Sequence, residues 1–269
     1  MRLVDSHCHL QADRFEADVE LVLGGARLAG VERILVPGWN PASCADALAL
    51  VDRFPWLDAA VGVHPHDAAN VDDSDWAGIV GLAADPRVVA IGETGLDFDR
   101  MFSPILAQLA NLRRNLHLAA DFDKPAILHC RSSDGQRDAQ DALLAEIRAF
   151  GNEPPPVLIH SFSGPLDYAE AMLELGAAVS FSALVFRPGE EASADVARLV
   201  PEDRILVETD SPFLSPPGAP RRRNEPEWVA VTARWLADQR GEDRDAFGER
   251  LVTNYDRLLP SSRRVGAPA

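Results

Sequence analysis

The sequence Asp5-Ser6-His7-Cys8-His9-Leu10 follows a short apolar run at the start of the chain. Side chains alternate between the two faces of an extended strand, so His7 and His9 are expected to project together and Cys8 away from them. Two imidazoles on one strand face supply half of the ligands that a divalent metal ion needs. The rest of the chain therefore decides whether this pair belongs to a metal site.

Further histidines and carboxylates each close or follow a short apolar run, and these are His64, His66, Glu93, His129, His160 and Asp210. Eight such runs can be counted, at residues 2–5, 33–36, 58–63, 88–91, 125–128, 156–159, 177–181 and 204–207. Most are continuous Val, Ile, Leu and Ala, which is typical of parallel strands covered on both faces. Segments with helical spacing separate them.

Eight β/α alternations in about 260 residues predict a single-domain α/β protein of the (β/α)8, or TIM-barrel, class. An open doubly wound sheet would lead us to expect a Gly-rich phosphate loop after an early strand, and there is none. The domain is expected to cover residues 1–260, with a closing helix at residues 244–259 and a flexible tail at 261–269. In a barrel, the candidate ligands at the carboxyl ends of the strands converge on one mouth.

The composition narrows the function classes. The chain has 269 residues and a net charge of −16, which argues against a broad basic surface that coats nucleic acid. A nuclease is not excluded, because two divalent cations would bring about four positive charges to the place where phosphate sits. No apolar run is long enough for a membrane span, and the first residues do not open a signal peptide. The three cysteines are far apart in the sequence, which favours reduced thiols. A cytoplasmic location is therefore expected.

Individual residues suggest roles at the predicted mouth. His129 and His160 end successive strands, and Glu93, between two glycines, could bridge two cations; the alternative is a loop glutamate paired with Arg100. Asp210 is placed to hold a metal ion and to accept a proton from water. Glu208 is expected to be a buried, hydrogen-bonded support, and Asp97 is expected to hold either a ligand histidine or the loop.

The loops could contact substrate. His64 and His66 are expected to bind substrate, to hold their loop or to bind metal. Arg131, Arg187 and the run 221–223 are either solvated or suited to phosphate, which guanidinium matches with two hydrogen bonds. No aromatic and basic residues interleave, so the sequence locates no stacking platform for single strands, but five phenylalanines lie on loops expected at the mouth: Phe98, Phe102, Phe162, Phe186 and Phe213.

These motifs together resemble the TatD family of metal-dependent deoxyribonucleases, within the amidohydrolase-type TIM barrels. The resemblance rests on ordered segments at residues 5–10, 62–66, 92–97, 129–131, 160–164, 208–214 and 223–226. It implies a binuclear site in which His7, His9 and Asp210 hold one ion, His129 and His160 hold the other, Glu93 bridges them and His64 approaches the substrate phosphate.

We therefore predict a metal-dependent hydrolase, a 3′–5′ exonuclease on single-stranded DNA ends, with Asp210 and Glu93 as catalytic residues. Its cofactors would be two divalent ions (Mg²⁺, Mn²⁺ or Zn²⁺), and His64, Arg131 and Arg223 would bind DNA. No membrane and no obligate protein partner are expected. The alternatives are a small-molecule amidohydrolase or esterase, including a D-aminoacyl-tRNA deacylase, and a non-catalytic barrel that binds a partner.

Overall fold

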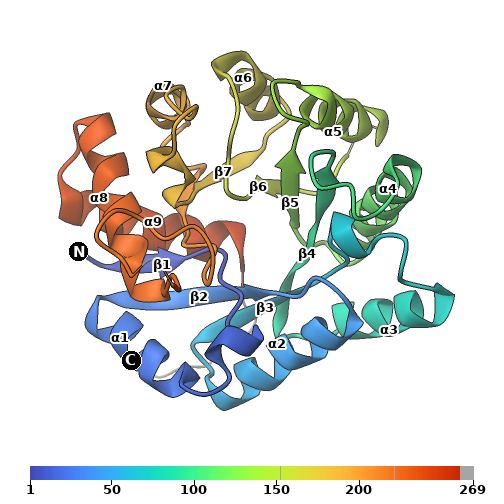
Figure 1. The fold of residues 1–269 in the computed structure, drawn as a ribbon, viewed down its shortest axis with the longest axis horizontal. Coiled ribbons are helices and arrows are strands. Elements are labelled where there is room, and N and C mark those ends of the chain that lie inside the picture. The colour runs from blue at the N-terminus through green and yellow to red at the C-terminus, as the bar shows by residue number, and fades with distance from the viewer. Residues whose placement is uncertain (152, 221, 261–269) are drawn as a thin grey trace. The chain divides into compact units, whose positions relative to one another are not determined.

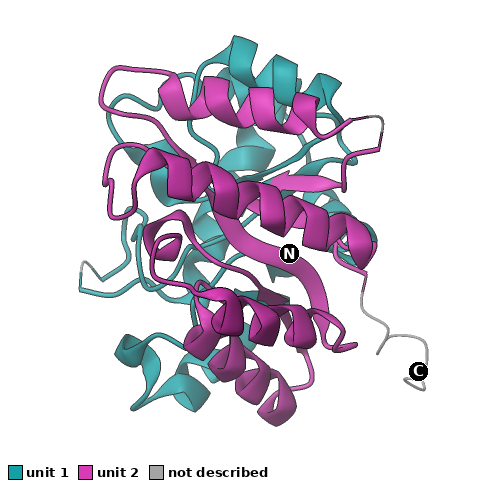
Figure 2. Cartoon of the chain, turned by 90° about the vertical axis from the view of Figure 1, so that its right-hand side faces the viewer, with its two compact units in different colours: residues 1–36, 159–258 teal, residues 37–158, 259–269 magenta. Residues whose placement is uncertain are grey.

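The computed structural model describes residues 1–151, 153–220 and 222–260. The described residues form two compact units, which Figure 2 shows in different colours. Unit 1 contains residues 1–36 and 159–258, and unit 2 contains residues 37–158 with residues 259 and 260. The predicted tail at 261–269 lies outside the described residues.

Within the described residues, eight strands follow one another along the sheet in chain order. They are β1 (Leu3–Asp5), β2 (Val31–Pro37), β3 (Leu57–Val61), β4 (Val88–Asp97), β5 (Ala126–Arg131), β6 (Val157–Ile159), β7 (Ala178–Phe181) and β8 (Ile205–Val207). The pairs β1–β2 and β7–β8 in unit 1 are parallel, as are β3–β4 and β4–β5 in unit 2. Parallel strands that alternate with helices in this order define the predicted (β/α)8 class.

Helices connect successive strands, as the apolar spacing predicts. They are α1 (Val19–Leu28), α2 (Pro41–Arg53), α3 (Asp73–Ala83), α4 (Ile105–Asp121), α5 (Asp138–Ala149), α6 (Leu166–Glu174), α7 (Ser193–Leu199), α8 (Val229–Arg240) and α9 (Arg244–Leu258). In unit 2, α4 packs against β4 and α2 against β3 (Figure 1). In unit 1, α8 and α9 pack against β1 and β8. None of the described helices is long and apolar enough to cross a bilayer.

Strand β4 is longer than the sequence predicts. It continues past Ile91 to Asp97 and pairs with β5 as far as Asp97 opposite Arg131. Gly95 permits this pairing, because a Cβ at that position would collide with the carbonyl oxygen of His129. The expectation that Glu93 follows a strand is therefore wrong. This carboxylate lies on the strand itself, and the Glu93 amide donates to the carbonyl oxygen of Gly38 (2.8 Å) in the segment after β2.

The segment before α8 also differs from its prediction. The pattern Asn224-Glu225-Pro226 predicts a helix whose N-cap is Asn224, but a 3-10 turn (Pro226–Trp228) comes first, and Glu225 precedes it. The Asn224 side chain instead donates to the carbonyl oxygens of Thr209 (3.0 Å) and Leu214 (3.3 Å) and accepts from the Glu225 amide (2.9 Å). Asn224 thus fixes the loop that follows β8.

Candidate metal centre

The first candidate site, which we call the His7 cluster, lies in unit 1 and consists of His7, His9, His160 and Asp210. The chain after β1 runs beside the chain after β8, with Cys8 and Ser211 in a parallel bridge. The Asp210 amide donates to the His7 carbonyl (2.9 Å), and the His9 amide donates to the Ser211 carbonyl (2.7 Å). These backbone bonds hold the His-x-His segment against the residue that the sequence places after β8.

The side chains of this cluster converge. The Nε2 atoms of His7 and His9 are 3.2 Å apart, and the His9 Nε2 lies 3.5 Å from Asp210 Oδ1. The rings of His7 and His160 are stacked, with centroids 3.9 Å apart. One donor atom each from His7, His160 and Asp210 lie within 4.8 Å of one another. Imidazole nitrogens with a carboxylate form a donor set that suits Zn²⁺, Mn²⁺ and similar ions.

Two buried carboxylates support the His7 cluster. Glu208 Oε1 lies 3.1 Å from His160 Nδ1, which confirms that Glu208 is a buried support that orients a histidine. Asp5 accepts hydrogen bonds from the Thr209 hydroxyl (2.6 Å) and from the amides of Thr209 (2.9 Å) and His7 (3.3 Å). Burial raises the pKa of Asp5 to about 8. The sequence interpretation gave Asp5 no role, although it directly precedes the His-x-His segment.

Asp210 combines an unusual backbone with a stabilised charge. Its φ of 54° lies in the left-handed region, which non-glycine residues adopt rarely and often at functional sites. Burial raises the pKa of this carboxyl, but the hydrogen bond from His9 and the nearby charges of His7 and His160 outweigh it, so the pKa is lowered overall. The ionised form, which is the form that binds a cation, is therefore favoured.

The second candidate site, which we call the His64 cluster, lies in unit 2 and consists of His64, Glu93 and His129. Glu93 Oε1 lies 3.3 Å from His64 Nε2 and 3.1 Å from His129 Nδ1. One donor atom from each residue lies within 4.8 Å of the others. Burial lowers the pKa of His64 to about 4, so its imidazole stays neutral and able to bind a metal ion.

Asp97 supports the His64 cluster, as predicted. Its Oδ2 lies 2.7 Å from His66 Nε2 and 3.5 Å from His129 Nε2, and its Oδ1 accepts from the amides of Asp99 (3.1 Å) and Arg100 (2.8 Å). Burial alone would raise the pKa of Asp97, but the hydrogen bonds from His129 and His66 hold it well below its usual range.

Gln108 on α4 is a residue that the sequence interpretation missed. Its Oε1 accepts from the Asp97 amide (2.8 Å), and its Nε2 donates to the carbonyl oxygens of Asp97 (2.9 Å) and Ser103 (2.8 Å). The only sequence signal is a polar residue among the buried positions of an amphipathic helix. Gln108 thereby fixes the end of β4 and the loop that follows it.

Each predicted ligand lies in one of the two clusters. His7, His9, His160 and Asp210 are together in unit 1, and Glu93 and His129 are together in unit 2, where His64 joins them. His160 was expected to share an ion with His129, and in the structure it stacks on His7. That shared ion and the bridging role of Glu93 stay predictions, as does the contact of His64 with phosphate.

The arginines expected to bind substrate are engaged with carboxylates. Arg131 forms an ion pair with Asp99 (2.7 Å) and is half exposed. Arg223 binds both Asp18 (2.8 Å) and Glu225 (2.7 Å), and its guanidinium lies 4.9 Å from the centre of the Phe15 ring. Their binding of substrate stays a prediction, and Arg221 lies outside the described residues.

A (β/α)8 fold with largely buried clusters of histidines and carboxylates on or directly after its strands defines the class of metal-dependent hydrolases. The family model described as "TatD related DNase" matches residues 4–260, and the chain belongs to that family.

Similar proteins cover nearly the whole chain. An uncharacterized metal-dependent hydrolase, YabD, of Bacillus subtilis is 33% identical, covering 96% of this chain and 98% of YabD. A protein named 3′-5′ ssDNA/RNA exonuclease TatD, of Pectobacterium carotovorum, is 35% identical, covering 96% of this chain and 99% of that protein. The crystal structure of YjjV, a TatD homologue from Escherichia coli, superimposes with a TM-score of 0.86 at 30% identity, over 96% of this chain and 98% of YjjV.

Proposed function

We propose that this protein is a metal-dependent nuclease that removes nucleotides from the 3′ ends of single-stranded DNA. The observation that carries the proposal is the pair of largely buried clusters on or directly after parallel strands, each combining histidines with a carboxylate. Relatives of matching length that are named 3′-5′ ssDNA/RNA exonucleases support the choice of reaction.

The residues present fit divalent metal ions. The neutral imidazole of His64 and the ionised carboxyl of Asp210 are the protonation states that metal binding requires. One ion would be held by His7, His9, His160 and Asp210, and a second by His64, Glu93 and His129. When bound, divalent ions supply Lewis acidity toward phosphate and lower the pKa of water.

The side chains would accept a proton, orient the histidines and contact the phosphates of the substrate. Asp210 would accept the proton of the attacking water, because its carboxylate is ionised and placed among the histidines of its cluster. Glu208 would hold the ring of His160, and Asp97 that of His129, in the orientation needed for binding a cation. Arg131, which is the last residue of β5, would contact the phosphate backbone of DNA together with arginines of the loops.

The test uses a 5′-labelled single-stranded oligonucleotide with Mg²⁺, with Mn²⁺ and with EDTA. A ladder that shortens from the 3′ end, disappears in EDTA and is lost in Asp210→Asn would support the proposal. Asp238→Asn is the matched control, because Asp238 lies on α8 with an exposed partner, Arg244. Full activity of Asp210→Asn would overturn its role, and no cleavage by metal-loaded protein would overturn the nuclease assignment.

A second candidate is a hydrolase of small molecules or of aminoacyl esters, such as a D-aminoacyl-tRNA deacylase. The net charge of −16 favours the small-molecule form of this candidate, because an acidic surface repels a polyanion and is indifferent to a small neutral substrate. It does not favour a deacylase over a nuclease, since aminoacyl-tRNA is itself a polyanion. Reversing the charge of Arg222 and Arg223 distinguishes the two. A nuclease should lose affinity and salt dependence, whereas an enzyme for a small neutral substrate should keep its KM.

A further inference from the structure

Two phenylalanines stand out from the aromatic residues that the structure describes, because they alone are exposed. Phe102 is 65% exposed and Phe213 is 52% exposed. Of the five phenylalanines on predicted mouth loops, Phe98 and Phe162 are buried, and Phe186 packs against Trp235. Of these five phenylalanines, only Phe102 and Phe213 are therefore exposed enough to contact a ligand.

Each exposed ring lies against a histidine that belongs to one of the clusters or lies next to it. In unit 2, the Phe102 ring meets His66 edge to face, with centroids 4.7 Å apart, and His66 in turn binds Asp97. In unit 1, the Phe213 ring lies at 72° to the His9 ring, with centroids 6.1 Å apart. Each ring is thus next to one of the two candidate metal clusters.

The backbone around Phe102 is held in place. The hydroxyl of Ser103 donates to the His66 carbonyl (2.8 Å) and accepts from the Ala69 amide (3.1 Å). Gln108 binds the Ser103 carbonyl (2.8 Å). An aromatic side chain on such a fixed loop is preorganised, so little conformational entropy is lost when a ligand packs on it.

The backbone around Phe213 is held as well. Its amide donates to the carbonyl of Asp210 (2.9 Å), and the neighbouring Pro212 and Leu214 carbonyls accept from Asn224. A second donor to Pro212 is the guanidinium of Arg14 (3.2 Å). Phe213 is therefore tied directly to a predicted metal ligand, and its ring is nevertheless left in solvent.

We propose that Phe102 and Phe213 each stack on a nucleobase of a single-stranded substrate. This inference rests on the proposed nuclease function. Nucleobases lie beside the phosphate that is cleaved, and every base offers a face for stacking on an aromatic ring. With a net charge of −16, the chain gains little from nonspecific attraction to a polyanion, so contacts that do not depend on charge must supply affinity.

The experiment compares two 5′-labelled oligonucleotides that differ only at the 3′ end. One carries natural bases, and the other carries tetrahydrofuran abasic residues at its terminal positions. We expect the wild-type enzyme to prefer the natural end. Phe102→Ala and Phe213→Ala should each lower kcat/KM for it by roughly 5- to 150-fold, from 1–3 kcal/mol per stacked base, with little change for the abasic end.

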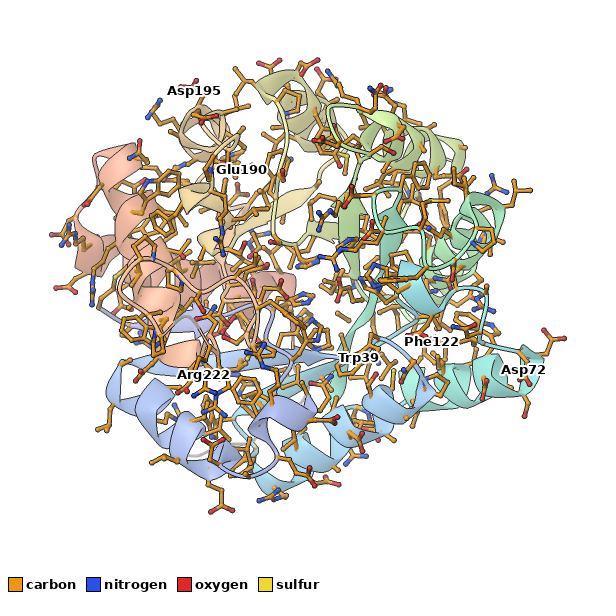
Figure 3. The ribbon with its side chains drawn as sticks, viewed as in Figure 1. Trp39, Asp72, Phe122, Glu190, Asp195 and Arg222 are labelled. Atoms are coloured by element: carbon orange, nitrogen blue, oxygen red, sulfur yellow. The ribbon has the colours of Figure 1, made fainter. Side chains whose placement is uncertain are left out.

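Conservative variants show whether the two phenylalanines act by stacking on a base or only by occupying space. Phe102→Trp and Phe213→Trp should keep the preference for natural bases, and the leucine variants should lose it, because leucine lacks a ring face. The matched control is Phe122→Ala. Phe122 (labelled in Figure 3) follows α4 at Asp121 and precedes β5, so it belongs to the amino end of the strand, away from the His64 cluster.

The possible results distinguish failure of the stacking inference from failure of the proposed nuclease function. Alanine variants that slow both oligonucleotides equally, or neither, would overturn the stacking inference and leave the nuclease function intact. A wild-type enzyme that cleaves DNA without preferring natural bases would also overturn stacking alone. A metal-loaded wild-type enzyme that cleaves neither oligonucleotide would overturn the nuclease function and the stacking inference with it.

Discussion

Replacing Gln108 with alanine should destabilise the protein more than any change on the exposed face of α4. The substitution removes all three hydrogen bonds by which Gln108 binds the backbone of Asp97 and Ser103. Both residues are buried, so the Asp97 amide and the two carbonyl groups lose partners that bulk water does not freely replace. Each orphaned buried group costs about 1–3 kcal/mol.

Part of this cost is recovered if a water molecule enters the space that the side chain leaves. We therefore expect the free energy of unfolding to fall by about 2–4 kcal/mol, a large part of the 5–15 kcal/mol typical of a domain. Urea denaturation followed by circular dichroism measures the change. Arg113→Ala is the control on the same helix, because it breaks only an exposed ion pair with Glu146.

A second variant, Gln108→Glu, tests whether the donated hydrogen bonds of this side chain stabilise the protein. The glutamate still accepts from the Asp97 amide but turns a second carboxylate oxygen toward two carbonyl groups, which raises its pKa in the folded state. This variant should be least stable at neutral pH and regain stability as the pH falls, when the protonated acid can donate. A loss for Gln108→Ala no larger than that of Arg113→Ala would refute the reasoning.

Three further predictions concern the clusters and the cysteines. Asp97→Asn should weaken metal binding by about 10- to 100-fold in calorimetric titration, and unchanged affinity would count against its supporting role. Burial lowers the pKa of His64 from 6.5 to about 4, so the unfolded chain binds the proton more readily than the folded chain. The metal-free protein should therefore lose stability as the pH falls from 6.5 toward 4. Denaturation at each pH should show a smaller loss for His64→Gln. Cys130 is partly exposed, whereas burial raises the pKa of Cys44 to about 12 and that of Cys8 well above its ordinary value. A thiol reagent should therefore modify Cys130 first, as mass spectrometry can show, and equal rates at Cys44 would contradict the assigned burial.

The convergence of the candidate ligand residues into clusters could be predicted from the sequence because its signal is local. A histidine or carboxylate that closes an apolar run, as His129 and His160 do, needs only strand polarity to place it at the carboxyl end of a parallel sheet. The carboxylates beside the clusters follow the same logic, and Glu208 was identified in this way. These inferences depend on a few neighbouring residues and on the order of the strands.

Other features depend on packing between distant segments and were not predictable. Phe102 is exposed and Phe98 is buried in the segment between β4 and α4, whose backbone Gln108 of α4 holds at Asp97 and Ser103, and no local pattern encodes this difference. The length of β4 depends on the close approach of Gly95 to His129. The binding of substrate by Arg223 stays a prediction, and the ion pair of Arg223 with Asp18 follows only from the tertiary structure.

The bond between Asp5 and Thr209 has a consequence for the synthesis of the protein. These residues are separated by 204 positions, and the two hydrogen bonds between them join the segment that leaves the ribosome first to one that leaves late. His7 and His9 must therefore wait for Asp210 before their cluster can close. Contacts of such long separation slow folding. The nascent chain thus offers only two histidines of this cluster to cellular metal ions until most of it has been made.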